Sequence, residues 1–345
     1  MSETQGLVVE ESRKGGSSVP EGARMMRAFG VHAYGGEQVF FELPVPDPGP
    51  GEVLVKVAGA GVGSWEAMIA SGEFPLLRPF PLALGLDFSG TVAVVGEGVS
   101  GISEGDAVYA YNYPLANNGA FAEYVMVPAS YLAPPPVSMG LVEAAAVPCA
   151  AVTAHKAVTE LLDVREGEVV LVTGGSGGVG HLAVQIARDL GARVVATASR
   201  AKHDFLRELG AETIIDYRDN GGDVAKSVRK LYPSGIDKAL CNVYGATVQW
   251  CVQSLRDGGK TVDLTGTELV APARVDHVRD FVAVADPERL GVISRMIDEG
   301  RLRVEIQQVY PFAAASSAVE EAAAGHVRGK LVLRMPKDEL GERRT

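Results

Sequence analysis

The chain has 345 residues, enough for two domains, and its 47% hydrophobic and 22% charged residues are typical of a globular protein. Its formal net charge of −11 argues against nonspecific binding to nucleic acid or to anionic membranes, because both need patches of Lys and Arg. No run of about 18 apolar residues is present, so we expect no membrane span. The three cysteines, Cys149, Cys241 and Cys251, are too few for a disulfide framework and favour a cytoplasmic location.

The first half of the chain is expected to be mainly β-structure. Residues 1–24 are rich in Ser, Gly and Glu and lack the apolar core of a secretion signal, so they are predicted to form a flexible extension. From 26 to 133, short alternating apolar runs such as 53–57 are separated by Gly- and Pro-rich turns. Many strands and few helices predict a partly closed β-barrel.

From about residue 145 strands and helices alternate, which predicts a doubly wound parallel sheet. The wholly apolar run 169–172 is typical of a buried parallel strand, and a helix with apolar residues at helical spacing follows it. The tail adds a helix at 288–298 and a closing strand at 330–333. We expect this strand to return to the first domain, which would then be discontinuous, at 25–149 and 285–345, around a second domain at 150–284.

A glycine-rich loop, residues 174–180, joins the apolar strand to the helix and is called the glycine loop below. Its glycines, from Gly174 to Gly180, permit a tight turn and a close approach of the backbone to a pyrophosphate. The helix N-terminus adds free N–H groups and a positive dipole end. Because the strand and the amphipathic helix frame it, the loop predicts a dinucleotide site rather than a plain connecting turn.

The next strand indicates which dinucleotide binds. NAD sites usually place Asp or Glu about 20 residues beyond the loop, to bind the ribose 2′-OH. Here the strand ends in the segment 197–202, which has no carboxylate but contains Arg200 and Lys202. Two cations suit a 2′-phosphate, so the sequence favours NADPH. The alternative is that both cations belong to an ordinary solvated helix start.

Several short motifs stand in a specific order and spacing. They are 50–55 (PGEVLV), 85–90 (GLDFSG), 105–108 (GDAV), 119–124 (GAFAEY), the glycine loop and 329–333 (GKLVL). Together they resemble the medium-chain dehydrogenase/reductase superfamily, specifically its zinc-free quinone oxidoreductase branch. The resemblance implies an α/β protein with a GroES-like barrel domain, a Rossmann domain, an active site in the cleft between them, and a homodimer formed by edge strands of the Rossmann sheets.

The resemblance also implies which residues surround the cofactor. Along the nicotinamide and pyrophosphate it places Thr153, Gly177, Gly178 and Val179. Around the adenosine 2′-phosphate it places Ser199, Lys202 and Tyr217, and for Tyr217 a surface aromatic at a strand end is the alternative. Flanking the adenine side and the nicotinamide it places Asn242, Leu264, Gly266, Phe281 and Val282.

Zinc is not expected. The three catalytic ligand positions of zinc alcohol dehydrogenases hold Gly63, Leu86 and Cys149 here. Gly and Leu have no donor atoms, whereas a catalytic zinc needs about three protein ligands. The whole chain has three cysteines, too few for the four-cysteine structural zinc lobe, and its six histidines show no metal spacing. Cys149 is interpreted as a small buried hydrophobe, with a reactive thiol as the alternative.

Without zinc, an enzyme of this type lacks the Lewis acid that polarises an alcohol or a plain carbonyl. We therefore expect hydride transfer from NADPH to a small activated acceptor, a quinone or a C=C bond conjugated to a carbonyl. A non-catalytic NADPH-binding protein of the same fold is the alternative. A short-chain reductase is rejected, because the loop stands far from the N-terminus and no Tyr-x-x-x-Lys pair occurs.

Three aromatic residues are candidates for the substrate pocket. Trp65 follows Gly63 in the early loop and could form an apolar wall; core packing is the alternative. Tyr111 and Tyr113 follow a barrel strand toward the cleft, and each is either a proton donor or a structural tyrosine. The sequence names no catalytic acid.

Overall fold

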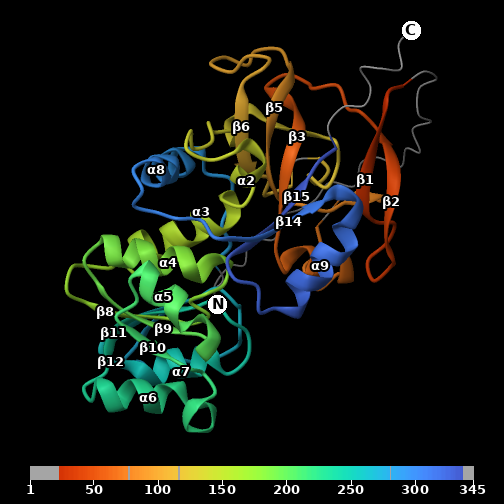
Figure 1. Cartoon of the computed structure of the whole chain (residues 1–345). Coiled ribbons are helices and arrows are strands. Elements are labelled where there is room, and N and C mark those ends of the chain that lie inside the picture. The colour runs from red at the N-terminus through yellow and green to blue at the C-terminus, as the bar shows by residue number, and fades with distance from the viewer. Residues whose placement is uncertain (1–22, 77, 116, 280, 337–345) are drawn as a thin grey trace, which may run out of the picture.

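The computed structural model describes residues 23–76, 78–115, 117–279 and 281–336. The extension expected at 1–24 therefore lies outside the described residues, apart from Ala23 and Arg24, as does the end of the chain from 337. A strand-rich lobe and an α/β lobe lie next to each other (Figure 1). Within the described part of the chain, no helix is both long and apolar enough to cross a membrane.

The strand-rich lobe contains strands from both ends of the chain. One sheet has the order β2–β1–β4, and the other has the order β14–β15–β3–β5–β6, with β7 paired to β3. The strands are β1 (Met25–Val31), β2 (Gln38–Pro44), β3 (Glu52–Val62), β4 (Leu82–Ala83), β5 (Asp87–Val95), β6 (Ala107–Tyr111), β7 (Tyr124–Pro128), β14 (Ile306–Pro311) and β15 (Lys330–Arg334).

The pairing of β15 with β3 brings the end of the chain back to the first lobe. The two strands are antiparallel, with Leu331 opposite Val62 and Leu333 opposite Ala60. These four side chains are buried, as the continuous apolar character of both strands predicts. Lys330, the first residue of β15, is thereby set beside the end of β3, where the chain enters the segment 63–65.

The α/β lobe is built on one six-stranded parallel sheet with the order β10–β9–β8–β11–β12–β13. Its strands are β8 (Val169–Val172), β9 (Arg193–Thr197), β10 (Thr213–Ile215), β11 (Ile236–Cys241), β12 (Leu255–Asp263) and β13 (Asp276–Val278). The main helices between them are α4 (Gly178–Asp189), α5 (His203–Leu209), α6 (Val224–Leu231) and α7 (Thr247–Ser254). A GroES-like β-domain joined to a Rossmann-type parallel sheet was the fold class expected from the sequence, and it is confirmed.

Two helices join the lobes. The boundary expected between 149 and 150 falls inside α3 (Pro148–Lys156), which packs against α4 of the second lobe and against α8 (Pro287–Asp298). The hydroxyl of Tyr109 in β6 lies 2.9 Å from the carbonyl oxygen of Leu290 and 2.8 Å from Ser294 Oγ, which ties α8 to the first lobe. The remaining α-helices of the described chain are α1 (Trp65–Ser71), α2 (Leu141–Ala144) and α9 (Ala315–Ala324).

Candidate functional site

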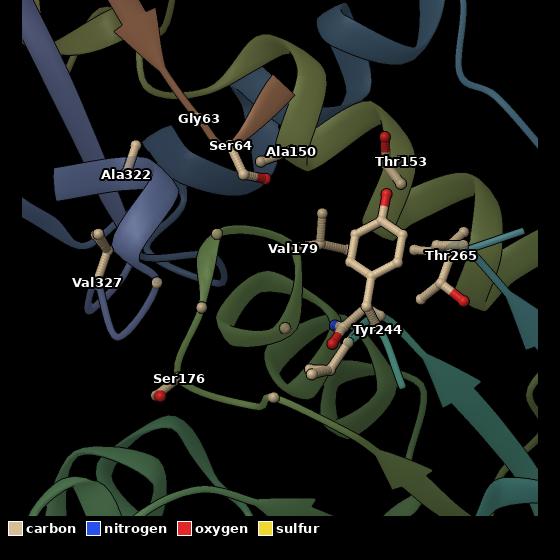
Figure 2. Close-up of a pocket in the computed structure, with 18 of the residues that line it drawn as sticks. Gly63, Ser64, Ala150, Thr153, Ser176, Val179, Tyr244, Thr265, Ala322 and Val327 are labelled. Atoms are coloured by element: carbon tan, nitrogen blue, oxygen red, sulfur yellow. The ribbon is translucent and has the colours of Figure 1, made fainter. Parts of the chain in front are cut away.

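A cavity of about 690 Å³ lies between the lobes, a size suited to a cofactor or a small ligand. Its second-lobe wall contains the glycine loop and residues at or after the C-terminal ends of β9, β11 and β12, which is where ligands bind in open α/β sheets. Its first-lobe wall contains the segments 62–65 and 322–330. Figure 2 shows Gly63 and Ser64 on one side of the cavity and Ala322 and Val327 beside the glycine loop.

Most residues predicted to surround the cofactor line this one cavity. They are Thr153, Gly174, Gly177, Gly178, Val179, Gly180, Ser199, Lys202, Tyr217, Asn242, Leu264, Phe281 and Val282. Arg200 and Gly266 do not line it. The guanidinium of Arg200 is exposed and lies 3.4 Å from the carboxylate of Asp219 instead. Of the three pocket candidates, Trp65 and Tyr111 line the cavity and Tyr113 does not.

The glycine loop presents an uncapped helix end to the cavity. Gly177 is the N-cap of α4 and no side chain accepts a hydrogen bond there, so the first N–H groups of the helix remain for a ligand. A Cβ added to Gly177 would meet nothing closer than the Gly174 carbonyl oxygen at 3.4 Å. A Cβ on Gly180 would lie 2.2 Å from that oxygen. Gly180 therefore serves the packing of helix on loop, whereas position 177 is open toward the cavity.

A buried polar atom in the same wall lacks a partner. Asn242 follows β11, and its backbone N–H donates to Thr173 Oγ1 at 3.1 Å. Its side-chain Nδ2 is buried and has no hydrogen-bond partner among the described residues. Because an unsatisfied buried donor costs about 1–3 kcal/mol, this amide fits a site that a ligand acceptor completes. With the uncapped helix, it makes these residues suitable for a dinucleotide.

The far end of the cavity is cationic. The Lys202 ammonium donates to the carbonyl oxygens of His326 and Val327, the latter at 3.3 Å, and forms no salt bridge within the described ranges. Burial, and then the charge of Arg328, lower the pKa of Lys202. The nearby carboxylate of Asp216 is already saturated. Its Oδ2 accepts the Arg200 N–H at 3.0 Å, and both of its oxygens accept from Arg218, which holds the pKa of Asp216 well below its usual range.

The opposite end of the cavity is apolar and aromatic. The half-buried Trp65 ring packs edge-on against Phe74, with 4.9 Å between centroids, and its remaining surface lines the cavity. Tyr111 is buried, and burial, followed by Cys149, raises the pKa of its phenol. Burial and then Asp87 raise the pKa of the Cys149 thiol to about 12, so the thiol stays protonated near neutral pH. Figure 2 shows the ring of Tyr244 at the cavity with Val179 and Thr265, and its hydroxyl lies 3.7 Å from Met68 Sδ.

Comparison with known proteins shows to which family this chain belongs. The chain matches the family described as an alcohol dehydrogenase GroES-like domain over residues 49–137 and that described as a zinc-binding dehydrogenase over 209–333. It is 30% identical over 332 residues to a chloroplastic quinone-oxidoreductase homolog of Spinacia oleracea, covering 90% of this chain and 99% of the relative. The chain belongs to the medium-chain dehydrogenase/reductase superfamily, in its quinone oxidoreductase-like branch.

The chain is also similar to two oxidoreductases that carry different names. The human mitochondrial NAD(P)H oxidoreductase RTN4IP1 is 30% identical over 328 residues, with 82% of each chain covered. A crystal structure of an NAD-dependent alcohol dehydrogenase superposes with a TM-score of 0.82 at 31% identity, covering 90% of this chain and 100% of the other.

Two of the three positions that hold the catalytic zinc in zinc alcohol dehydrogenases carry different residues in this chain. Gly63 and Leu86 offer no donor atoms, and the half-buried Cys149 lines the cavity together with Gly63. Across the described ranges, no group of three or more His, Cys, Asp or Glu side chains is arranged to hold a metal ion.

The sequence did not reveal Lys330 and Tyr244, which line this cavity, or Asp87 and Glu66, which contact Lys330 and Gly63 but do not line it. Lys330 and Asp87 occur in two of the motifs used to identify the superfamily, and Glu66 follows Trp65. All three side chains are buried. A lysine beginning an otherwise apolar strand, GKLVL, was the available signal, because such a charge is buried only when it is paired. Tyr244 stands in the loop after Asn242 and carried no comparable signal.

Proposed function

We propose that this protein is an NADPH-dependent reductase of quinones or of α,β-unsaturated carbonyl compounds. The observation that carries the proposal is the cavity itself. One end combines the glycine loop, the unpaired amide of Asn242 and a cationic rim, and the other is apolar and aromatic. A charged cofactor and an apolar acceptor would thus meet in one cleft.

NADPH is favoured over NADH by the groups at the cationic end. Lys202 forms no salt bridge to a carboxylate within the described chain, so its charge is available to a 2′-phosphate. Asp216 is the nearby acid that could have accepted a ribose 2′-OH, but its oxygens are occupied by Arg200 and Arg218. Ser199 and Tyr217 line the same end of the cavity.

The bound cofactor would supply the hydride, and the protein would supply position and environment. The uncapped end of α4 would bind the phosphates, and Asn242 would donate a hydrogen bond from Nδ2 to the cofactor. Trp65 and Tyr111 would exclude water from the acceptor. Catalytic zinc is not part of the proposal, because two of its three ligand positions, Gly63 and Leu86, cannot coordinate a metal.

A cofactor titration and a substrate panel test this function. Fluorescence titration should give tighter binding of NADPH than of NADH, and equal or tighter NADH binding would refute the cofactor assignment. The panel should contain quinones, enones and simple alcohols, and NADPH should be consumed only with the first two. Tight NADPH binding without turnover on any acceptor would instead support a non-catalytic NADPH-binding protein. Elemental analysis should find no stoichiometric zinc.

We also propose a homodimer and a cytoplasmic location. β13 is the terminal strand of the six-stranded sheet as described, so its outer edge is available for pairing with a second copy. Light scattering coupled to size-exclusion chromatography tests the dimer, and a monomer at micromolar concentration would refute it. The named relatives are chloroplastic or mitochondrial, so fractionation of the native host is the test of location.

A further inference from the structure

A buried cluster of charged groups adjoins the apolar end of the cavity. Lys330, at the start of β15, is 7% exposed, and Asp87 and Glu66 are 4% and 3% exposed. The ammonium of Lys330 lies 3.3 Å from Asp87 Oδ2, and Asp87 Oδ1 accepts the backbone N–H of Cys149 at 2.7 Å. Glu66 Oε2 accepts the backbone N–H of Gly63 at 2.8 Å.

The ammonium of Lys330 has more donors than partners. Lysine carries three N–H donors, and Asp87 is the one hydrogen-bond acceptor found for this ammonium among the described residues. Burial acts to lower the pKa of Lys330, but the neighbouring acids, Asp87 first, outweigh it and the pKa is raised, so the group remains charged. A purely structural lysine, buried to this degree, would be expected to have its other donors satisfied too.

Glycine at position 63 leaves the ammonium accessible from the cavity. A Cβ added to Gly63 would lie 3.8 Å from Lys330 Nζ and 3.6 Å from Glu66 Oε2. Gly63 and Lys330 both line the cavity, and Figure 2 shows Gly63 next to Ser64 and Ala150 on its wall. A bulky residue at 63 would bring its side chain against the ammonium.

The aliphatic part of Lys330 also sets where the charge stands relative to the cofactor site. A Cβ added to Gly178 in the glycine loop would lie 3.2 Å from Lys330 Cδ. The side chain therefore runs from the phosphate-binding end of α4 to the segment 63–65. Its ammonium lies between the residues assigned to the cofactor and those assigned to the acceptor.

We propose that Lys330 binds the carbonyl oxygen of the substrate, which reaches the ammonium through the gap left by Gly63. The substrate class is an enone, an enal or a quinone, in which an oxygen conjugated to the reduced carbon becomes negatively charged. Hydride from bound NADPH would form the new C–H bond, the displaced π electrons would collect on the oxygen, and water would supply the final proton. Lys330 keeps its own proton and stabilises the charge on the oxygen by a hydrogen bond, while Asp87 positions the ammonium. This inference deepens the proposed function and takes its substrate class from it.

A phenol that reports its own ionisation tests the assignment without turnover. 4-Nitrophenol carries an oxygen that becomes anionic, and its phenolate is read by absorbance. In protein saturated with NADP⁺, the ammonium should lower the apparent pKa of the bound phenol by about one to three units. Lys330→Met should abolish the shift and Lys330→Arg should retain part of it. A full shift in Lys330→Met would overturn the proposal.

Two further variants guard against misfolding. Lys330→Met alone strands the Asp87 charge, so the double variant Lys330→Met/Asp87→Asn, which removes both charges, should fold and still lack the shift. Gly63→Val retains Lys330 and should weaken the shift by covering it. If the pKa shift of the phenol is unchanged in Gly63→Val, the substrate oxygen does not reach Lys330 through the gap at position 63.

Lys202→Met serves as the matched control at the other end of the cavity. It should weaken NADPH binding while leaving the phenol shift intact once the cofactor is saturating. Lys330→Met should show the opposite pattern. If no enone or quinone is reduced and the shift is nevertheless present, the proposed function fails and the anion site at Lys330 stands. If reduction occurs and Lys330→Met keeps the shift, the function stands and this inference fails.

Discussion

His181 and Gly177 are joined by a hydrogen bond of 2.8 Å between the ring Nδ1 and the carbonyl oxygen. The other ring nitrogen, Nε2, accepts the backbone N–H of Glu305 at 3.2 Å, so the proton resides on Nδ1 and the ring is neutral. Burial is the largest effect on this ring and lowers the pKa of His181 to about 4. One buried imidazole thus ties the glycine loop to a residue of the first lobe.

Replacing His181 by Ala should therefore destabilise the protein and weaken cofactor binding. The change strands the N–H donor of Glu305, at about 1–3 kcal/mol, whereas the Gly177 carbonyl oxygen still accepts the backbone N–H of residue 181 at 3.0 Å. Because the folded-state pKa of His181 is depressed, its contribution is present above about pH 6.5 and is lost as the pH falls through about 4. Urea unfolding between pH 4 and 7 should show a shallower pH dependence in the variant, and identical slopes would count against this role.

Gly177 and Gly180 should respond to a side chain in opposite ways. Gly177 has φ −82° and ψ −175°, which any residue adopts, and a Cβ there has room. Gly177→Val should therefore fold with a near-normal melting temperature and lose NADPH binding, because its side chain occupies the phosphate site. Gly180→Ala should instead lower the melting temperature, since its Cβ meets the Gly174 carbonyl oxygen at 2.2 Å. Normal NADPH affinity in folded Gly177→Val would show that the phosphates bind elsewhere.

Lys202 and Arg200 form a second matched pair. Lys202 lines the cavity, whereas Arg200 pairs with Asp219 on the surface. Lys202→Met should weaken NADPH binding about 10- to 100-fold, equivalent to about 1.5–3 kcal/mol for a charged hydrogen bond, with little change for NADH. Arg200→Met should alter neither affinity beyond about twofold, as expected of an exposed pair. A larger loss in Arg200→Met than in Lys202→Met would reverse the assignment.

Glu66 should limit stability above neutral pH. Burial raises the pKa of its carboxyl to about 7 from an ordinary value of 4.5, although Lys330 opposes the shift. A raised acid pKa favours the protonated folded state, so this stabilisation is full below about pH 4.5 and is lost as the pH rises to about 7. Across this window the free energy of unfolding of Glu66→Gln should exceed that of the wild type by up to about 3 kcal/mol. The Gln side chain keeps an acceptor for the Gly63 N–H. Denaturation at pH 4.5, 6 and 8 measures the gain, and a constant difference would disprove the titration.

Most residues predicted for the nucleotide half of the candidate site line one cavity, because local rules govern where they lie. An apolar strand, a glycine loop and an amphipathic helix are contiguous, so position along the chain gives position in space. The Arg200 side chain does not line the cavity, because its direction depends on Asp219, which stands 19 residues further along. Gly180 was grouped with the phosphate contacts, although the space around it shows a packing role.

The acceptor half was not predictable in the same way. Lys330 and Asp87 are 243 residues apart and meet because β15 and β5 both pair with β3. Nothing local to either residue indicates this meeting. Leu86 and Asp87 are adjacent, but the family resemblance gives a role, that of a zinc-ligand position, to the first alone. Tyr113 follows the same strand as Tyr111 and stacks on its ring but does not line the cavity, and no periodic pattern separates the two.

Because of the segment 322–330, the second lobe cannot be separated from the first without loss of part of the cavity. The N–H of Gly329 donates to the Ser176 carbonyl at 2.9 Å, and Lys202 donates to the carbonyl oxygens of His326 and Val327, so a first-lobe segment completes the proposed nucleotide site. A Rossmann unit excised at 150–284 would therefore carry an incomplete pocket. For the same reason, a chimera that exchanges cofactor preference with a relative must transplant residues 322–330 together with the glycine loop and the strand end at 197–202.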